Sequence, residues 1–295
     1  MKMKKSNKNI TFTLTLLLPW IITFVVFWLY PLLYAGYLSF TQYETLTNKS
    51  TFIGFENYAN IYSDDLFWLA FYNTAIFTLA TVPITTVISL LLAVILNNKL
   101  IKFKEFFKIS YFTPSVTSLV VISLIFTNLY SKDGYVNSIL QFLGMPFTER
   151  GWLLEPSTAL ISIMAMDIWM AVGYYMILFL AGMQTIPNDL YDAAKLSGAS
   201  SWQQLKKITL PLIKPTLLFV IVINTIKSFQ VFIEIYVMTK GGPLNHTTSL
   251  VYLVYINAFE NIDMFGYASA LAYIVFIILL IFSIVQIKLL KLNNI

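Results

Sequence analysis

Long runs without a charged residue divide this chain into segments. Four such runs cover residues 10–43, 66–98, 109–131 and 264–287. Two further apolar stretches, residues 156–187 and 215–239, contain only isolated charges. An α-helix needs about 20 apolar residues to cross the hydrocarbon core of a bilayer. Each of the six stretches therefore predicts one membrane-spanning helix.

The composition is typical of an integral membrane protein. Apolar residues make up 58% and charged residues 11%, and the mean hydropathy is +0.74. A soluble domain has about 45–50% apolar and about 25% charged residues. These values exclude a soluble enzyme, a nucleic-acid-binding protein and a disordered chain. The net charge of +5 does not indicate nucleic acid, because the charges gather at the ends of the predicted spans.

We expect an all-α polytopic membrane protein with six transmembrane helices in one domain, residues 1–295. The predicted spans cover residues 12–40, 73–97, 107–130, 158–182, 212–238 and 265–288. The first apolar run is much longer than the about 7–15 apolar residues of a signal peptide, so it is predicted to be a retained span. The 66–98 run is too short for two crossings, and its first part is expected to lie at the membrane interface.

Basic residues are distributed unevenly between the two sides that six spans define. Fourteen of the 19 Lys and Arg residues fall on the side of the two termini, and four fall on the other side. Cytoplasmic loops carry an excess of Lys and Arg. Both termini are therefore predicted to be cytoplasmic, as is the loop of residues 184–211 between the fourth and fifth spans.

The residue inventory leaves little room for catalysis by this chain. Cysteine is absent and histidine occurs once, which argues against a disulfide framework, a thiolate nucleophile and a zinc site. None of the 11 glycines is followed by Lys, so the phosphate-binding sequence GxxxxGK[ST] does not occur. The chain is therefore not expected to be an enzyme or to hold a cofactor.

The 184–211 loop has the pattern of two short helices. Pro187 cannot continue the fourth span, and Asn188 or Asp189 is predicted to cap a helix over residues 190–197. Gly198 stands where a left-handed turn would end that helix. Ser200 or Ser201 is predicted to cap a second, amphipathic helix. Such a helix pair has the shape to dock into a groove of a partner protein.

In this loop Asp192-Ala193-Ala194 is followed after three residues by Gly198, and after nine more by Ile208-x-Leu210-Pro211. This spacing resembles the EAA loop of ABC importer permeases. Asp192 stands where that family has Glu, which keeps the charge with a shorter reach. In the family this loop forms the coupling helix that seats in a cleft of the ATP-binding subunit. The resemblance assigns that role to Asp192, Ala193, Ala194, Gly198, Ala199, Ile208, Leu210 and Pro211.

Further motifs extend the resemblance over most of the chain. They are YPLLYAGYLSFTQY at 30–43, FIGFENY at 52–58, SFQVF at 228–232, MTKGGP at 238–243 and FGYASAL at 265–271. They are similar to the first permease of carbohydrate importers of the maltose, raffinose and multiple-sugar type, and of the glycerol-3-phosphate system. The resemblance implies a core transporter region of about residues 70–290 in a bacterial cytoplasmic membrane.

The same resemblance implies a set of partners. They are a second, homologous permease chain, two ATP-binding subunits that bind ATP and Mg, and an extracellular solute-binding protein, either free or a lipoprotein. The expected function is half of a translocation pathway for a sugar or oligosaccharide. A glycerol-3-phosphate, polyol or anionic-sugar permease is the alternative.

Three charged residues lie inside predicted spans, where a lone charge costs at least about 2.5–3.5 kcal/mol. They are Asp167 in the fourth span and Lys227 and Glu234 in the fifth. Helical spacing places Asp167, Met170, Ala171 and Tyr174 on one face, and Asn224, Lys227, Ser228 and Val231 on another. Because Lys227 and Glu234 are seven residues apart, all three charges are predicted to line one channel.

By the register of the flanking motifs, these positions resemble those lining the sugar site of the maltose-type permease. One interpretation is that Asp167, Asn224, Lys227 and Ser228 hydrogen-bond sugar hydroxyls while Tyr174 stacks on a ring. The other is an Asp167–Lys227 ion pair that ties two spans together, and the two are compatible. Glu234 is expected nearer the outer surface, as a gate or a contact to the binding protein.

Other classes of membrane protein fit the sequence less well. An ion-coupled secondary transporter would show inverted repeats and often ten or more spans. An intramembrane enzyme would need a nucleophile with a base, or metal ligands, at membrane depth. A channel would need a selectivity-filter sequence, which is not recognisable here.

Overall fold

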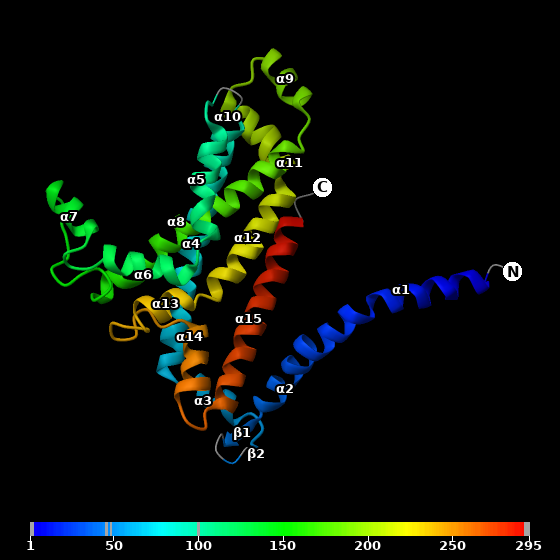
Figure 1. The fold of residues 1–295 in the computed structure, drawn as a ribbon, viewed down its shortest axis with the longest axis vertical. Helices are drawn as coiled ribbons and strands as arrows, with labels where there is room; N and C mark the ends of the chain where they lie inside the picture. Colours follow the sequence, from blue (N-terminus) through cyan, green and yellow to red (C-terminus); the bar gives the residue numbers. More distant parts are fainter. Residues whose placement is uncertain (1–2, 45–46, 48, 99–100, 292–295) are drawn as a thin grey trace. The chain divides into compact units, whose positions relative to one another are not determined.

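The computed structural model describes residues 3–44, 47, 49–98 and 101–291. The predicted domain limits at residues 1 and 295 lie outside these residues. The chain forms two compact units, Met1–Asp64 with Val254–Phe276, and Asp65–Leu253 with Ile277–Ile295. Helices supply nearly all the regular structure of the described residues, as the prediction of an all-α fold requires (Figure 1).

The first unit begins with a long apolar helix that contains one π-helical turn. Its elements are α1 (Met3–Phe24), η1 (Val25–Leu29), α2 (Tyr30–Leu38), the antiparallel strands β1 (Thr41–Glu44) and β2 (Lys49–Phe52), α3 (Glu56–Tyr62), η3 (Ile256–Glu260) and the start of α15 (Phe265–Lys291). Asn57 donates hydrogen bonds to the carbonyls of Ser39 and Thr41, which ties α3 to the end of α2. The Tyr267 hydroxyl donates to Asp64 at 2.6 Å and ties α15 to the end of the segment after α3.

The second unit is built around α4 and α8, which pack along each other, with α5 against α8 and α12 against α4 (Figure 1). Its elements are α4 (Asp65–Asn97), α5 (Lys104–Val116), α6 (Leu119–Leu129), α7 (Tyr135–Phe142), α8 (Pro156–Gln184), α9 (Asn188–Leu196), α10 (Ser201–Gln204), η2 (Leu205–Thr209), α11 (Leu210–Leu212), α12 (Lys214–Phe229), α13 (Ile233–Met238) and α14 (Leu250–Tyr255). A buried cluster that includes Ala93, Tyr175, Phe179 and Val220 forms its core.

Within the part of the chain that the structure describes, five helices are long and apolar enough to cross a bilayer, and each lies over one of the predicted spans. They are Thr15–Leu38, Asp65–Asn97, Pro156–Gln184, Lys214–Met238 and Phe265–Lys288. Helix α4 covers residues 65–97 without interruption and is roughly 50 Å long, which exceeds a bilayer core of about 30 Å, so an interfacial position of its first part stays a prediction.

The third predicted span, residues 107–130, is not one helix. Helices α5 and α6 replace it and are bent by 96° relative to each other. The chain leaves the helix at Thr117, whose backbone is extended, shortly after Pro114 in the last turn of α5. Helices of 13 and 11 residues are roughly 20 and 16 Å long, so neither crosses a bilayer core of about 30 Å alone. If α5 and α6 are counted together as one bent span, the described residues contain six candidate spans.

Gly173 allows α5 to lie close against α8. A Cβ atom at Gly173 would stand 1.8 Å from the carbonyl oxygen of Tyr111. We expect Gly173→Ala to lower the free energy of unfolding by about 2 kcal/mol, because one extra methyl group must push the two backbones apart. Thermal unfolding of the purified protein in detergent measures this. Ala165→Val, on an exposed position of the same helix, is the control and should change little.

Candidate functional site

The 184–211 loop folds into the predicted pair of short helices, α9 and α10. Helix α9 begins at Asn188 after Pro187 without a side-chain cap, so the predicted capping by Asn188 or Asp189 is wrong. Gly198 has φ +76°, which confirms the predicted left-handed turn. Ser200 caps α10 in a reciprocal pair: its hydroxyl accepts from the Gln203 amide, and the Gln203 side chain accepts from the Ser200 amide.

The loop exposes one surface and buries another. Of the residues that the EAA resemblance singled out, four are exposed (Asp192, Ala193, Gly198 and Pro211) and four are half-buried (Ala194, Ala199, Ile208 and Leu210). Two large apolar side chains that the motif did not include also face outwards: Leu196 is 91% exposed and Trp202 is 67% exposed. Exposed apolar side chains beside a fixed turn are typical of a surface that a partner covers.

Three polar side chains that the sequence did not single out hold the loop together. The hydroxyls of Tyr191 and Thr209 share a hydrogen bond of 2.9 Å, which joins α9 to η2. The Gln204 side chain donates to the Ala199 carbonyl at 2.9 Å. Tyr191 and Ile208 also pack against the core cluster of the second unit. The loop is therefore bonded across its own turn and seated on the spans that precede and follow it.

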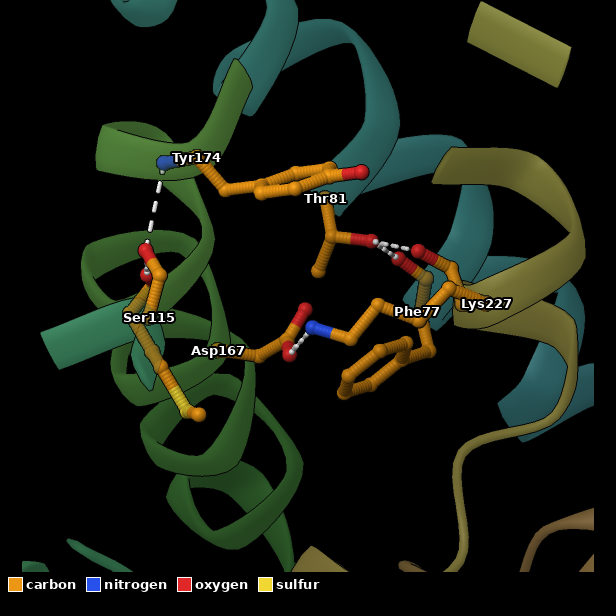
Figure 2. A network of polar contacts seen from close by, with 8 residues as sticks. Phe77, Thr81, Ser115, Asp167, Tyr174 and Lys227 are labelled. Atoms are coloured by element: carbon orange, nitrogen blue, oxygen red, sulfur yellow. Dashed lines mark hydrogen bonds and ion pairs between the residues drawn. The ribbon is translucent and has the colours of Figure 1, made fainter. Parts of the chain in front are cut away.

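A second group of polar residues lies where α4, α8 and α12 meet (Figure 2). Lys227, in the last turn of α12, reaches to α8 and donates to a carboxylate oxygen of Asp167 at 2.8 Å. The Asp167 side chain is 2% exposed and the Lys227 side chain is 40% exposed. The ion pair that was one of the two interpretations of these residues is thus present, and the Lys227 side chain is only partly buried.

The other predicted pathway residues differ in how much of each side chain is exposed. Tyr174 is 43% exposed, and its backbone amide donates to Ser115 of α5, whose hydroxyl donates to the Met170 carbonyl (Figure 2). The remaining predicted members are buried: Met170, Ala171, Asn224, Ser228, Val231 and Glu234. Ala171 belongs to the hydrophobic core cluster. Tyr174 and Lys227 are therefore the predicted pathway residues that are not buried.

The predicted helical register of Lys227 with Glu234, and of Asn224 with Val231, is wrong. Helix α12 ends at Phe229 and α13 begins at Ile233, so residues 230–232 interrupt the face. The carbonyl of Val231, freed by this break, accepts a hydrogen bond from the Ser249 hydroxyl at 2.7 Å. Glu234 still lies near enough to Asp167 and Lys227 to interact electrostatically with both. The path of the chain through the break at residues 230–232, and not a continuous helical face, therefore places Glu234 near the other two charged residues.

Helix α4 contributes a stripe of buried hydroxyls that the sequence interpretation missed. Thr74, Thr78, Thr81, Thr85 and Ser89 recur at helical spacing and are all buried. Thr81 donates to Ser228 of α12 at 3.2 Å, and Ser89 donates to the Val172 carbonyl of α8 at 2.9 Å. The recurrence of Thr and Ser every three or four residues was the available signal.

Some buried polar atoms in and beside this stripe of hydroxyls form no hydrogen bond. Among the described residues, both amide atoms of Asn224 and the hydroxyls of Thr78 and Thr85 have no hydrogen-bond partner. Buried polar groups are normally hydrogen-bonded. These buried atoms of Asn224, Thr78 and Thr85 therefore have hydrogen-bonding capacity that this conformation does not use. The described residues hold no group of three or more His, Cys, Asp or Glu that is placed to hold a metal ion.

Comparisons with known proteins agree with this architecture. The profile of the family described as binding-protein-dependent transport system inner membrane component matches residues 70–289. The lactose transport system permease protein LacF of Rhizobium radiobacter is 36% identical over 263 residues, which cover 88% of each chain. The multiple sugar-binding transport system permease protein MsmF of Streptococcus mutans is 36% identical and covers 90% of this chain and 91% of its own.

A solved structure shares the fold. It is a chain of a bacterial ABC transporter involved in the import of the acidic polysaccharide alginate, with a TM-score of 0.86, 22% sequence identity and 100% of each chain covered. This likeness concerns the fold alone. The family match and the two relatives confirm the resemblance that the loop and flanking motifs indicated. The chain belongs to the family of binding-protein-dependent transport system inner membrane components.

Proposed function

We propose that this chain is the membrane-spanning permease subunit of an ATP-driven importer and forms half of the pathway for a sugar or oligosaccharide. The observation that carries the proposal is the 184–211 loop, a capped and internally bonded helix pair that exposes Asp192, Leu196 and Gly198. The names of the relatives, permeases for lactose and for multiple sugars, support the choice of solute class.

In this proposal the exposed side of the loop docks in a groove of the ATP-binding subunit. Asp192, Ala193 and Gly198 lie at the contact, and Leu196 enters the groove, because its side chain is 91% exposed. Ile208 and the Tyr191–Thr209 bond pass the movement of the loop to the spans. A packed, hydrogen-bonded helix pair moves as one body, so closure of the ATP-binding subunits would displace α8 and α12 together.

The solute is proposed to meet Lys227 and Tyr174, the accessible members of the polar group. Asp167 holds the Lys227 ammonium in place, and the Tyr174 ring offers a stacking surface. The positive charge of Lys227 is already paired with Asp167, and Glu234 adds a second carboxylate nearby. An unpaired anionic solute gains little there, so a neutral sugar fits the site better than a phosphorylated polyol or a uronate.

The assembly proposed around this chain has four kinds of partner. A second permease of the same family completes the pathway, two ATP-binding subunits hold ATP and Mg, an extracellular binding protein delivers the solute, and the bacterial cytoplasmic membrane surrounds the spans. The uneven distribution of basic residues supports a cytoplasmic position for both termini and for the 184–211 loop.

Reconstituted transport tests this function. The purified complex in liposomes, supplied with its binding protein and with ATP on the loop side, is expected to take up a neutral oligosaccharide. Uronates and glycerol 3-phosphate, offered in parallel, should be taken up poorly. Uptake that follows an ion gradient and needs no ATP would contradict the proposal.

Tyr191→Phe should weaken coupling while leaving the fold intact. The Phe ring keeps the packing of Tyr191 against the core cluster but loses the 2.9 Å bond to Thr209. A hydrogen bond contributes about 1 kcal/mol. We therefore expect roughly fivefold less solute imported per ATP hydrolysed. Ser197→Ala removes a hydroxyl that bonds within α9 only, and it should leave the ratio unchanged. Equal ratios in both variants would show that the Tyr191 bond plays no part.

A further inference from the structure

The segment between α6 and α8 carries a strongly two-sided helix, α7. Tyr135, Ile139 and Phe142 lie along one side and are 74%, 57% and 90% exposed. Leu143, directly after the helix, is 60% exposed. Asn137, Ser138 and Gln141 occupy the other side. Apolar and polar residues are thus separated around the helix, and on the polar side Ser138 and Gln141 are exposed while Asn137 is buried.

The polar side of α7 faces a water-accessible hollow. Asn137, Ser138 and Gln141 line a cavity of about 460 Å³ together with Lys132, Asp133, Phe147, Thr148 and Glu149. The charged side chains of this hollow need water around them. Residues 134–148 contain no charged residue, and charged pairs bracket them: Lys132 with Asp133, and Glu149 with Arg150.

Asn137 fixes the orientation of the helix. Its amide nitrogen donates to the carbonyls of Lys132 and Thr148, at 2.9 and 2.7 Å, and its amide oxygen accepts from the Trp152 indole at 2.8 Å. The backbone amide of Trp152 in turn donates to the Tyr130 carbonyl at 3.0 Å. Helix α7 is therefore tied to the end of α6 and to the entry of α8, and its apolar side cannot turn inwards.

These two attachment points are the ends of two candidate membrane spans, so we expect them at a membrane surface. Helix α6 is the second half of the bent span, and α8 is the next span. Residues 130–155 leave the bilayer at one end and enter it at the other, which keeps α7 close to the boundary between lipid and water. The outward side chains of α6 continue the apolar surface: Val121, Leu124 and Ile125 are 47%, 51% and 52% exposed.

We propose that α7 is an interfacial helix that lies in the headgroup region of the bilayer. Tyr135, Ile139 and Phe142 enter the lipid, and the hollow on the opposite side faces water. A short helix with aromatic and aliphatic residues on one side and polar residues on the other binds the lipid interface in this way. The attachment of α7 to the ends of two spans favours lipid over a protein as the occupant of its apolar side, because such a position lies at the boundary of the bilayer.

Fluorescence quenching in a bilayer tests the proposal directly, because the chain contains no cysteine. Phe142→Cys and Gln141→Cys introduce single thiols on opposite sides of α7, each labelled with bimane in the full-length chain with its co-purifying subunits in nanodiscs. Nitroxide-bearing phospholipids should quench the label at 142 at least about twofold more than the label at 141, and aqueous iodide should show the opposite order.

Two results would overturn the proposal. Equal iodide quenching at 142 and 141 would mean that the apolar side lies open to water. Protection of 142 from both iodide and nitroxide lipid would mean that a protein covers it. Protection before the extracellular binding protein is added identifies a co-purifying subunit, whereas protection that develops only after its addition identifies the binding protein.

Discussion

Lys227→Met should destabilise the protein by about 3–5 kcal/mol, the largest effect on stability that we expect. The substitution leaves the Asp167 carboxylate 2% exposed without its partner, and Glu234 adds a second buried carboxylate nearby. Asp167→Asn should cost only about 1 kcal/mol, because the stranded Lys227 side chain is 40% exposed and keeps access to a polar environment.

The double variant Asp167→Asn with Lys227→Met gives the matching control. It removes both charges and should be clearly more stable than Lys227→Met alone. Thermal unfolding of the purified proteins in detergent measures all three. Equal losses for the two single variants, or no recovery in the double variant, would contradict a buried, paired Asp167.

The same double variant separates the two interpretations of the pair. If it folds and transports with unchanged solute affinity, the pair serves only to join α8 to α12. Because Lys227 presents surface and Asp167 does not, we expect the affinity for solute to fall in this variant while the complex assembles normally.

Gly198→Val should lower coupling about tenfold, the largest effect on transport that we expect. Gly198 has φ +76°, and a β-branched residue in the left-handed region costs about 1–2 kcal/mol. A Cβ atom there meets nothing within 4 Å, so the cost falls on the turn between α9 and α10 and not on packing. A free-energy cost of that size lowers the population of the turn conformation that docks by about tenfold. ATP hydrolysis should continue while solute uptake falls.

Gly54→Val is the matched control for this variant. Gly54 has φ +64°, and a Cβ atom at this position would also meet nothing within 4 Å, but the residue lies outside the 184–211 loop. The two variants carry similar backbone strain, so both should lose similar stability. Uptake per ATP hydrolysed, measured in liposomes, should fall for Gly198→Val alone. An equal fall in both would mean that the loss follows from stability.

Local chemistry explains which features the sequence predicts. A left-handed turn at Gly198 and a cap at Ser200 depend on residues within a few positions, so pattern analysis finds them. The Asp167–Lys227 pair is predicted because charge inside apolar stretches is costly and opposite charges seek each other.

Features that depend on packing between distant segments are the ones that the sequence interpretation misses. The break at residues 230–232 is compensated by Ser249, 18 residues away from Val231, and no helical pattern reveals that bond. The bend between α5 and α6 likewise occurs in a run without a charged residue, for which the sequence interpretation expected one straight span. The buried hydroxyls of α4 gain meaning only when Thr81 meets Ser228 and Ser89 meets Val172.

Co-purification tests the central claim most directly. The full-length chain, extracted from its native membrane in mild detergent, should bring an ATP-binding subunit with it. A variant with residues 192–199 scrambled should still fold, because the core cluster lies outside that segment, but should lose this subunit. A chain that purifies without any ATP-binding protein, or that keeps one after scrambling, would contradict the proposed role of the loop.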